Sequence, residues 1–571
     1  INSLKKAMKW DEDKYNLEYD LDEYKIVAVR HFNMGAMENK GLNIFNSKLV
    51  LADSKTATDD ELERIESVIA HEYFHNWTGN RITCRDWFQL SLKEGLTVYR
   101  DQSFTSDLHG YGLKRIDDVS CLRNFQFAED MGPTSHAVKP KEYVAIDNFY
   151  TTTIYEKGAE IIRMLEILLG QEKFMKGINV YIQTFDGKAA TTENFIDSLI
   201  NCDSLEEKNL IFDVAKFRNW YYNAGTPRVT INQSWDAKNS ILNVSFEQKL
   251  VGYTTNENIE MVIPILYACY SSGEVSKTIV KEDLFVLDKN KKDLQINLPN
   301  GEKTAPYLSV FRRFSSPVIW EPDLSPDNLL FLFLNDDDYF TRWDSGQLLM
   351  RKIIKNRINN MDNCALEDSF INAIKQSIKS LETKDPFFLA TLLTFPGLPE
   401  LESLFNNVDP INIYKTSLNF KVTVGMRILK DFKILSDHLL KNINQEWPMG
   451  KGERKLLGTI WSYLTLAGDI KVKRNCVDSI NHSSMTIARA ALEALKPIDS
   501  SETEEASNLF YSLWKDNLVV LDSWFSYEAS RPSKHGINFI ENLLSHPKFD
   551  WKAPNSMRAV LGGFSKNIES F

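Results

Sequence analysis

The chain has 571 residues, of which 43% are hydrophobic and 25% charged, a balance that is typical of globular proteins and excludes fibrous and intrinsically disordered classes. The formal net charge of −11 at pH 7 gives no attraction to phosphate backbones or anionic lipid, so we expect no nucleic acid and no membrane among its partners. The length predicts about three or four structural units.

The cysteines indicate the cellular compartment of the protein, and the first residues indicate whether the sequence is complete. The six cysteines are scattered without a C-x-x-C pair, which indicates neither a disulfide framework nor a cysteine zinc site. We therefore expect a reducing compartment and a cytoplasmic protein. No apolar run approaches the length of a membrane span. The chain starts Ile-Asn-Ser-Leu-Lys-Lys, without an initiator Met or a signal pattern, so we interpret it as part of a longer protein.

Periodicity along the chain predicts three regions. Residues 24–30 have the pattern of a strand, and residues 58–207 are mostly helical, with a period near 3.6 between residues 61 and 79. Residues 226–320 alternate between apolar and polar, and this pattern predicts a small β-sandwich. Its turn signals lie at residues 236–239 and 299–301. Helical periodicity then returns to the end, for example at residues 340–358 and 370–381.

The motif His71-Glu-Tyr-Phe-His75 lies in the first helical region. Two histidines four residues apart on a helix differ by about 40° in direction, so both imidazoles can reach one ion. Glu72 projects about 100° away, where it can stand beside a metal and take a proton from the attacking water. The pattern favours a zinc hydrolase, although chance produces H-E-x-x-H on the order of once per hundred chains of this composition.

A catalytic zinc ion keeps three protein ligands and one open position. Glu94 follows His75 after an interval of eighteen residues, which leaves room for a turn at Gly79-Asn80 and for a second helix to pack against the first. His71, His75 and Glu94 would then hold one zinc ion per chain. A solvated helix carboxylate is the simpler interpretation of Glu94 considered alone.

Three longer strings, at residues 32–45, 71–86 and 149–158, together with Gly35-Ala-Met-Glu-Asn39, resemble the gluzincin metallopeptidases of the aminopeptidase N family. They are most similar to the bacterial-type alanyl aminopeptidases, and a looser resemblance continues to the end of the chain. The resemblance to this family implies a multidomain α+β protein. Its parts would be a thermolysin-like α/β catalytic domain at residues 1–218, a β-sandwich at residues 219–321 and an α-helical superhelical domain at residues 322–571.

The resemblance implies that the G-A-M-E-N segment is an edge strand beside the cleft. Glu38 would bind the free α-ammonium of the substrate, because a carboxylate in a partly desolvated site makes a charged N-terminus a condition of binding. Gly35 and Ala36 would offer backbone groups to an extended peptide, and Met34 would line an adaptable first specificity pocket. Without the flanking string, these residues would be interpreted as surface and core residues.

Two further roles come from the resemblance. The hydroxyl of Tyr155 would donate to the oxyanion that forms during attack on the scissile carbonyl. Arg558 would reach the C-terminal side of the peptide. The ordinary alternatives are a half-buried packing tyrosine and a solvated helix arginine.

The sequence thus predicts a monomeric zinc aminopeptidase acting on peptides with a free N-terminus, with broad specificity for neutral and basic first residues. Two alternatives stay open: an endopeptidase with the same metal ligands, and a catalytically silent scaffold or receptor on the same fold. Members of the family that the chain resembles begin with a β-rich domain and some of the catalytic domain before this segment, and they continue with further helices after it. The resemblance implies that the preceding part supplies a second carboxylate to the substrate amine. We therefore expect the chain by itself to be poorly soluble and nearly inactive.

Overall fold

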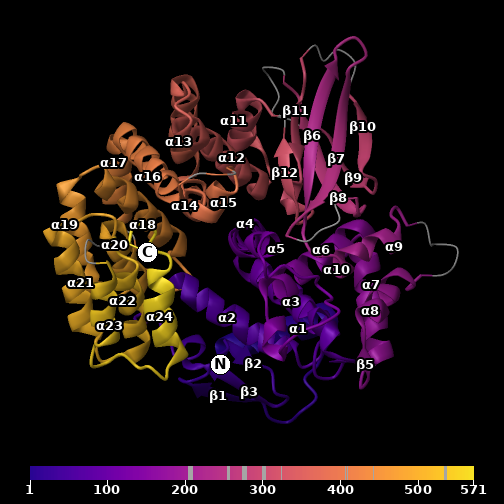
Figure 1. The fold of residues 1–571 in the computed structure, drawn as a ribbon, viewed down its shortest axis with the longest axis horizontal. Helices are drawn as coiled ribbons and strands as arrows, with labels where there is room; N and C mark the ends of the chain where they lie inside the picture. The colour runs from indigo at the N-terminus through magenta and orange to yellow at the C-terminus, as the bar shows by residue number, and fades with distance from the viewer. Residues whose placement is uncertain are drawn as a thin grey trace. The chain divides into compact units, whose positions relative to one another are not determined.

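The structure is a computed structural model (Figure 1). It describes residues 1–203, 210–253, 258–272, 279–298, 304–322, 324–405, 407, 409–441, 443–532 and 536–570. The chain forms two compact units: the first comprises Ile1–Leu21 and Ile69–Gly346, and the second comprises Asp22–Val68 and Gln347–Phe571. Among the described residues, no helix combines the length and the apolarity needed to cross a bilayer.

The helical part of the first unit is built around α3 (Leu90–His109), most of whose side chains are buried. Helix α3 packs against α4 (Tyr111–Cys121) and α6 (Gly158–Leu169). Two short strands, β4 (Thr83–Cys84) and β5 (Ala189–Ala190), pair in parallel. The other helices of this part are α1 (Asn2–Tyr15), α5 (Phe127–Met131), α7 (Gln171–Phe185), α8 (Thr192–Ile200), α9 (Val214–Phe217) and α10 (Asn219–Tyr222).

The expected β-sandwich follows in the same unit and is confirmed (Figure 1). One sheet has the order β10-β7-β6-β12 and the other the order β11-β8-β9. Phe246 and Phe285, one from each sheet, stack with ring centroids 5.1 Å apart. The strands are β6 (Thr226–Asp236), β7 (Ile241–Val251), β8 (Ile263–Tyr270), β9 (Ile279–Leu287), β10 (Lys291–Asn297), β11 (Tyr307–Val310) and β12 (Ile319–Pro322).

The turn expected at residues 236–239 joins β6 to β7. Asp236 fixes it, since its Oδ1 accepts the backbone N–H groups of Lys238 and Asn239 at 3.0 and 3.2 Å. The turn expected at residues 299–301 lies outside the described residues. The sandwich is followed by α11 (Pro326–Asn335), which Ser325 caps by accepting the N–H of Asn328 at 3.2 Å.

The second unit contains a three-stranded sheet of order β1-β3-β2. Strand β1 (Lys25–Val29) is the strand expected at residues 24–30, and it pairs in parallel with β3 (Leu42–Asn46). Strand β2 (Ala36–Met37) pairs with β3 in the antiparallel sense. The Gly-Ala-Met-Glu-Asn segment therefore lies at an edge of this sheet, as expected.

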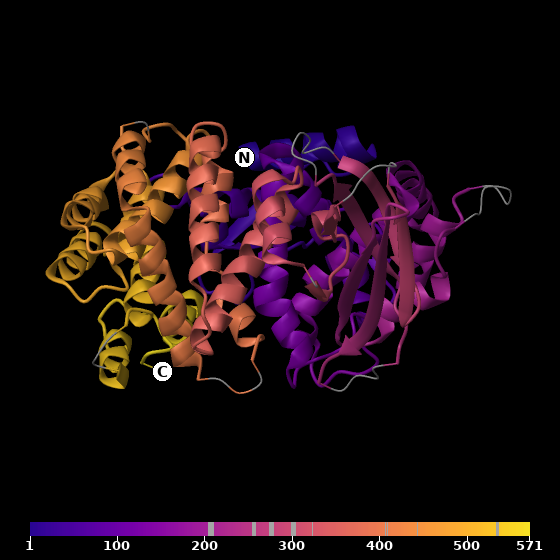
Figure 2. The ribbon, with the colours of Figure 1, turned by 90° about the horizontal axis from the view of Figure 1, so that it is seen from above.

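The rest of the second unit is mostly helical, and its colour in Figure 2 runs from salmon to yellow. Helix α18 packs against α14, α16, α17, α19 and α20, so it lies at the centre of this part. Its Leu456, Leu457, Ile460 and Trp461 are fully buried. The helices are α13 (Cys364–Leu381), α14 (Pro386–Leu392), α15 (Leu398–Glu402), α16 (Pro410–Arg427), α17 (Leu429–Leu439), α18 (Lys451–Leu466), α19 (Ile470–Asp478), α20 (Met485–Leu495), α21 (Ser501–Trp514), α22 (Leu518–Ala529), α23 (Gly536–Leu544) and α24 (Pro554–Phe564).

Two helices cross from one unit to the other along the chain. Helix α2 (Asp59–Phe74) begins in the second unit and ends in the first, and α12 (Tyr339–Ile358) begins in the first and ends in the second. Within the second unit, the buried Arg454 donates to both carboxylate oxygens of Asp59 at 2.7 and 3.0 Å. Asp59 is the first residue of α2, so this buried pair ties the start of that helix to α18.

Candidate metal centre and substrate segment

The two histidines of the motif lie at the end of α2. The helix ends at Phe74, earlier than the periodicity up to residue 79 indicated, and His75 is the first residue after it. The N–H of His75 still bonds the carbonyl of His71 at 3.1 Å, so the helical spacing of the two imidazoles is kept. Gly79 then turns the chain with φ +144°, a conformation that favours glycine. Glu94 follows on the second helix, α3, as predicted.

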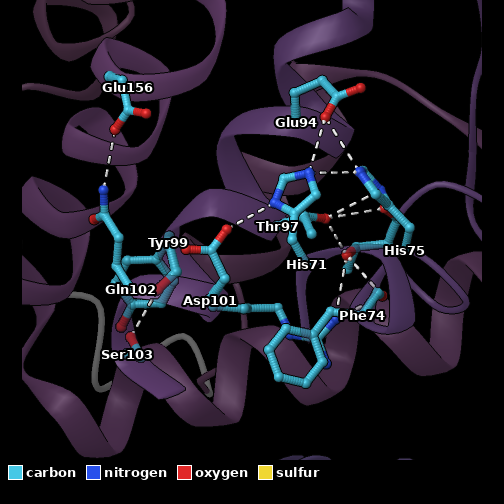
Figure 3. A network of polar contacts seen from close by, with 12 residues as sticks. His71, Phe74, His75, Glu94, Thr97, Tyr99, Asp101, Gln102, Ser103 and Glu156 are labelled. Carbon is cyan, nitrogen blue, oxygen red and sulfur yellow. Dashed lines mark hydrogen bonds and ion pairs between the residues drawn. The ribbon is translucent and has the colours of Figure 1, made fainter. Parts of the chain in front are cut away.

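Three ligand atoms converge at this point (Figure 3). The Nε2 atoms of His71 and His75 lie 3.0 Å apart. Oε2 of Glu94 lies 3.1 Å from Nε2 of His75 and 3.5 Å from Nε2 of His71. His75 and Glu94 are 1% and 2% exposed, so water is largely excluded from two of the three donors.

The hydrogen bonds of the two Nδ1 atoms determine whether the Nε2 atoms can bind a metal ion. Nδ1 of His71 lies 2.7 Å from Oδ2 of Asp101 (Figure 3). Nδ1 of His75 lies 2.8 Å from the carbonyl oxygen of Thr78. Because these oxygens accept hydrogen bonds, each Nδ1 carries a hydrogen, and a neutral imidazole then has a bare lone pair at Nε2. Two such lone pairs and a carboxylate oxygen repel one another unless a cation lies among them. The donor set therefore fits zinc.

The charges around these three groups also favour a cation among them. Burial opposes ionisation of Glu94, yet Lys93, with Nζ 2.6 Å from Oε1, and the two imidazoles hold its pKa well below the ordinary value. Burial alone would lower the pKa of His71, but hydrogen bonds to Asp101 and Glu94 raise it well above the ordinary value. The surrounding carboxylates thus favour positive charge at the point where the imidazoles meet.

Glu72 is adjacent to the first histidine on α2 and is 6% exposed. Its charge contributes to raising the pKa of His71, so the carboxylate is close enough to interact with that imidazole. A buried carboxylate beside a metal centre is the type of group that moves protons in hydrolysis. The role of Glu72 as the base nevertheless stays a prediction.

Tyr155 lies on η5 (Thr153–Lys157), a π-helical turn that leads into α6. Its half-buried ring stacks on the imidazole of His71, with centroids 6.3 Å apart and planes 16° apart. π-helical turns occur frequently at functional sites. The structure therefore brings Tyr155 next to the histidine cluster. The contact of its hydroxyl with an oxyanion remains a prediction.

The π-helical turn is fixed from several sides. Ser91 of α3 donates to the carbonyl of Ile154 at 2.9 Å. Gln126, on a second π-helical turn, η3 (Leu122–Gln126), donates to the hydroxyl of Thr153 at 3.2 Å. The buried Lys157 donates to Asp130 at 2.8 Å. The backbone that carries Tyr155 is thus tied to α3, η3 and α5.

Sequence reasoning did not find the residues that orient the ligands. Asp101, Lys93 and the Thr78 carbonyl all contact His71, His75 or Glu94, and none was singled out. One usable signal existed for Asp101, which follows Glu94 by seven residues. Two turns of helix place residues seven apart on the same face of α3. A carboxylate at that spacing is a candidate partner for a ligating histidine.

The residues expected to bind substrate amine lie in the second unit. The backbone N–H of Asn46 bonds the carbonyl of Gly35 at 2.8 Å, and Ala36 pairs with Phe45 in the sheet. Glu38, just after the strand, is 7% exposed, whereas Met34, before it, is 40% exposed. The structure thus places one partly buried carboxylate and one exposed thioether at the two ends of the edge strand.

Arg558 lies on α24 of the same unit. Its Nη2 donates to the carbonyl oxygen of Asn33 at 2.6 Å and to Oδ1 of Asn33 at 2.9 Å. The expected contact between Arg558 and a peptide stays a prediction. The structure adds a contact that was not expected, between this arginine and the residue that precedes Met34.

The domains of the chain match known families along nearly its whole length. Residues 1–220 match the peptidase family M1 domain. Residues 225–323 match a domain of unknown function, DUF3458, described as an Ig-like fold. Residues 326–571 match the domain of unknown function DUF3458_C, described as ARM repeats. With the metal-binding geometry and the relatives below, these matches show that the chain belongs to the M1 peptidase family.

Within that family it is similar over its whole length to bacterial proteins named aminopeptidase N. That of Haemophilus influenzae is 39% identical over 100% of this chain and 66% of its own length. That of Escherichia coli is 36% identical over 99% of this chain and 65% of its own. A crystal structure of Legionella pneumophila aminopeptidase A in complex with aspartic acid has a TM-score of 0.88 and 28% identity, covering 100% of this chain and 64% of that one. The chain thus spans about two thirds of these relatives.

Proposed function

We propose that the protein is a zinc-dependent aminopeptidase that removes single residues from the free N-termini of peptides. The observation that carries this proposal is the convergence of Nε2 of His71, Nε2 of His75 and a carboxylate oxygen of Glu94, whose mutual distances are 3.0–3.5 Å. Relatives named aminopeptidase N along the whole chain support it. The proposal includes one zinc ion per chain, action as a monomer in the cytoplasm, and domain boundaries near residues 218 and 321.

His71, His75 and Glu94 would hold the zinc ion, with Asp101 orienting the first histidine. When bound, zinc supplies a Lewis acid that polarises a carbonyl and makes water more acidic. The chain supplies the rest. Asp101 keeps the imidazole of His71 in the tautomer that offers Nε2 inward, because its carboxylate accepts the hydrogen of Nδ1 at 2.7 Å.

Glu72 would accept the proton of the attacking water and deliver it to the leaving amine. Its burial and its proximity to His71 support this role, since a carboxylate in a poorly solvated site transfers protons without first reorganising water. Tyr155 would donate from its hydroxyl to the oxyanion as the carbonyl carbon becomes tetrahedral. The stacking of its ring on His71 supports that placement.

Glu38 would bind the α-ammonium of the substrate and thereby limit cleavage to the first peptide bond. Its low exposure supports the role, because an ammonium paired with a largely desolvated carboxylate is bound more strongly than one paired in water. Met34 would line the pocket for the first side chain, where a flexible thioether accepts several shapes. We expect broad specificity for neutral and basic first residues.

A panel of fluorogenic aminoacyl amides, applied to the full-length protein, tests the proposal. We expect hydrolysis of alanyl, leucyl and arginyl amides, loss of activity with a zinc chelator, and recovery when zinc is returned. An aspartyl amide belongs in the panel because the Legionella structure contains aspartic acid. An N-acetylalanyl substrate cleaved as fast as the free one would indicate an endopeptidase. No hydrolysis by zinc-loaded protein would indicate a silent scaffold.

A further inference from the structure

A reciprocal amide pair joins α24 to the edge of the three-stranded sheet. Nδ2 of Asn555 donates to Oδ1 of Asn46 at 2.8 Å, and Nδ2 of Asn46 lies 3.1 Å from Oδ1 of Asn555. The two residues are 509 positions apart in sequence and belong to the same unit. Asn46 is 4% exposed, so the pair has little competition from water on that side.

Asn46 in turn holds both ends of the segment before β2. Its side-chain Nδ2 donates to the carbonyl of Phe32 at 3.0 Å, and its backbone N–H bonds the carbonyl of Gly35 at 2.8 Å. Residues 33 and 34 therefore lie between two anchors on one asparagine. Because Nδ2 of Asn46 donates to both Phe32 and Asn555, rotation of this amide would disturb both hydrogen bonds.

Helix α24 makes two more contacts with the same stretch of chain. Arg558 donates to the carbonyl and the side chain of Asn33 at 2.6 and 2.9 Å. Ser556 lies 3.5 Å from a guanidinium nitrogen of Arg30 and donates to the carboxylate of Asp522 at 2.7 Å. The first half of α24 therefore contacts residues on both sides of Phe32.

We propose that Asn555 and Arg558 are positioning residues, which fix residues 32–35 and so set the place of Met34 and of the edge strand that leads to Glu38. This inference rests on the proposed function, in which Met34 lines the first specificity pocket and Glu38 binds the substrate amine. In this role Arg558 acts through Asn33. Loosening the segment raises the entropic cost of ordering it around a substrate, which weakens binding.

The expected kinetic effect falls on KM. Asn555→Ala removes one reciprocal hydrogen-bonded pair, so KM for alanyl, leucyl and arginyl amides should rise roughly three- to tenfold. The rise should differ among the three substrates, because Met34 would be displaced together with its pocket. Turnover number and zinc content should stay near the wild-type values, because the substitution leaves His71, His75 and Glu94 in place.

The matched control is a second asparagine pair in the same unit. Nδ2 of Asn356 on α12 donates to Oδ1 of Asn363, the residue before α13, at 3.0 Å. Asn356→Ala should lower stability by a similar amount and leave KM unchanged. Asn46→Ala and the double variant Asn46→Ala/Asn555→Ala complete a cycle in which the effects on KM should be clearly less than multiplicative.

Hydrogen–deuterium exchange of the backbone gives a readout that does not need activity. Asn555→Ala should raise exchange at residues 32–38, and Asn356→Ala should not. Unchanged exchange there, or an equal KM change with Asn356→Ala, would overturn the positioning role. A wild-type protein that hydrolyses no aminoacyl amide would instead overturn the proposed function, and the exchange at residues 32–38 would still decide the positioning.

Discussion

Gly95 and Gly158 meet backbone to backbone: a Cβ atom on Gly95 would lie 2.9 Å from the carbonyl carbon of Gly158. This contact joins α3 to the start of α6 directly between two residues of the proposed site. Glu94 precedes Gly95, and Tyr155 lies three residues before Gly158. The absence of two side chains therefore lets the metal ligand and the tyrosine turn approach each other.

Gly95→Ala should lower both stability and turnover. The new methyl group would also lie 3.0 Å from Oγ of Ser91, which holds the tyrosine turn, so α3 and α6 must separate. We expect a loss of about 1–3 kcal/mol in the free energy of unfolding and a fall in kcat larger than any rise in KM. Denaturant unfolding and steady-state kinetics measure these. Gly562→Ala, with no atom within 4 Å of the new Cβ, is the control and should be neutral or stabilising.

Asp101→Asn should weaken zinc binding without removing a ligand. The amide no longer offers a charged acceptor to Nδ1 of His71, so the inward tautomer is less favoured. We expect the zinc affinity to fall roughly 10- to 100-fold, measured by competition with a chromogenic chelator. Asp107→Asn, on the same helix but paired with Lys14, should keep the wild-type affinity. Equal affinities in all three proteins would show that Asp101 does not orient the ligand.

Tyr155→Phe should reduce kcat and change KM little. The ring would keep its stacking on His71, whereas the hydroxyl, which acts in the transition state, would be lost. Losses on the order of 10²–10³ in kcat are typical when a donor to an oxyanion is removed. Steady-state kinetics with an alanyl amide separates the effect on kcat from the effect on KM. A variant that changed only KM would assign the hydroxyl to substrate binding.

Glu156→Gln should stabilise the protein at alkaline pH. Burial, and next the charge of Asp118, raises the pKa of Glu156 from an ordinary value of 4.5 to about 8. Between these values the unfolded chain releases a proton that the folded chain keeps, so the contribution of Glu156 to stability falls as pH rises through that window. Glutamine cannot titrate and still accepts a hydrogen bond from Gln102.

We expect the advantage of Glu156→Gln over wild type to be small at pH 5 and on the order of 1 kcal/mol or more at pH 8.5. Thermal unfolding at the two pH values measures it. The same difference between variant and wild type at both pH values would show that Glu156 ionises normally in the folded protein.

The sequence was sufficient where local spacing decides geometry. His71 and His75 share a helix face because they are four residues apart. Strand β2 is an edge strand, as the resemblance of the Gly-Ala-Met-Glu-Asn segment to the family implied. The return of Glu94 on a second helix followed from the eighteen-residue interval. The three structural regions followed from changes of period between 3.6 and 2.

Contacts between distant segments could not be predicted in this way. Arg558 and Asn33 are separated by 525 residues, and no pattern in either segment points to the other. The close approach of Gly95 and Gly158 depends on how two helices cross, which hydrophobic periodicity does not specify. The end of α2 at Phe74 is set by the turn at Gly79 and its hydrogen bonds, whereas the apolar pattern continues past it.

Zinc content per chain tests most directly whether His71, His75 and Glu94 form the metal centre. Wild-type protein and Glu72→Gln should each contain one zinc ion, because the substitution leaves all three ligands in place. Only the Glu72→Gln variant should lose turnover. Glu94→Ala should contain almost none after dialysis against a chelator, since two ligands do not hold the ion in competition. Full zinc content in Glu94→Ala, measured by atomic absorption, would contradict the assignment of the metal centre.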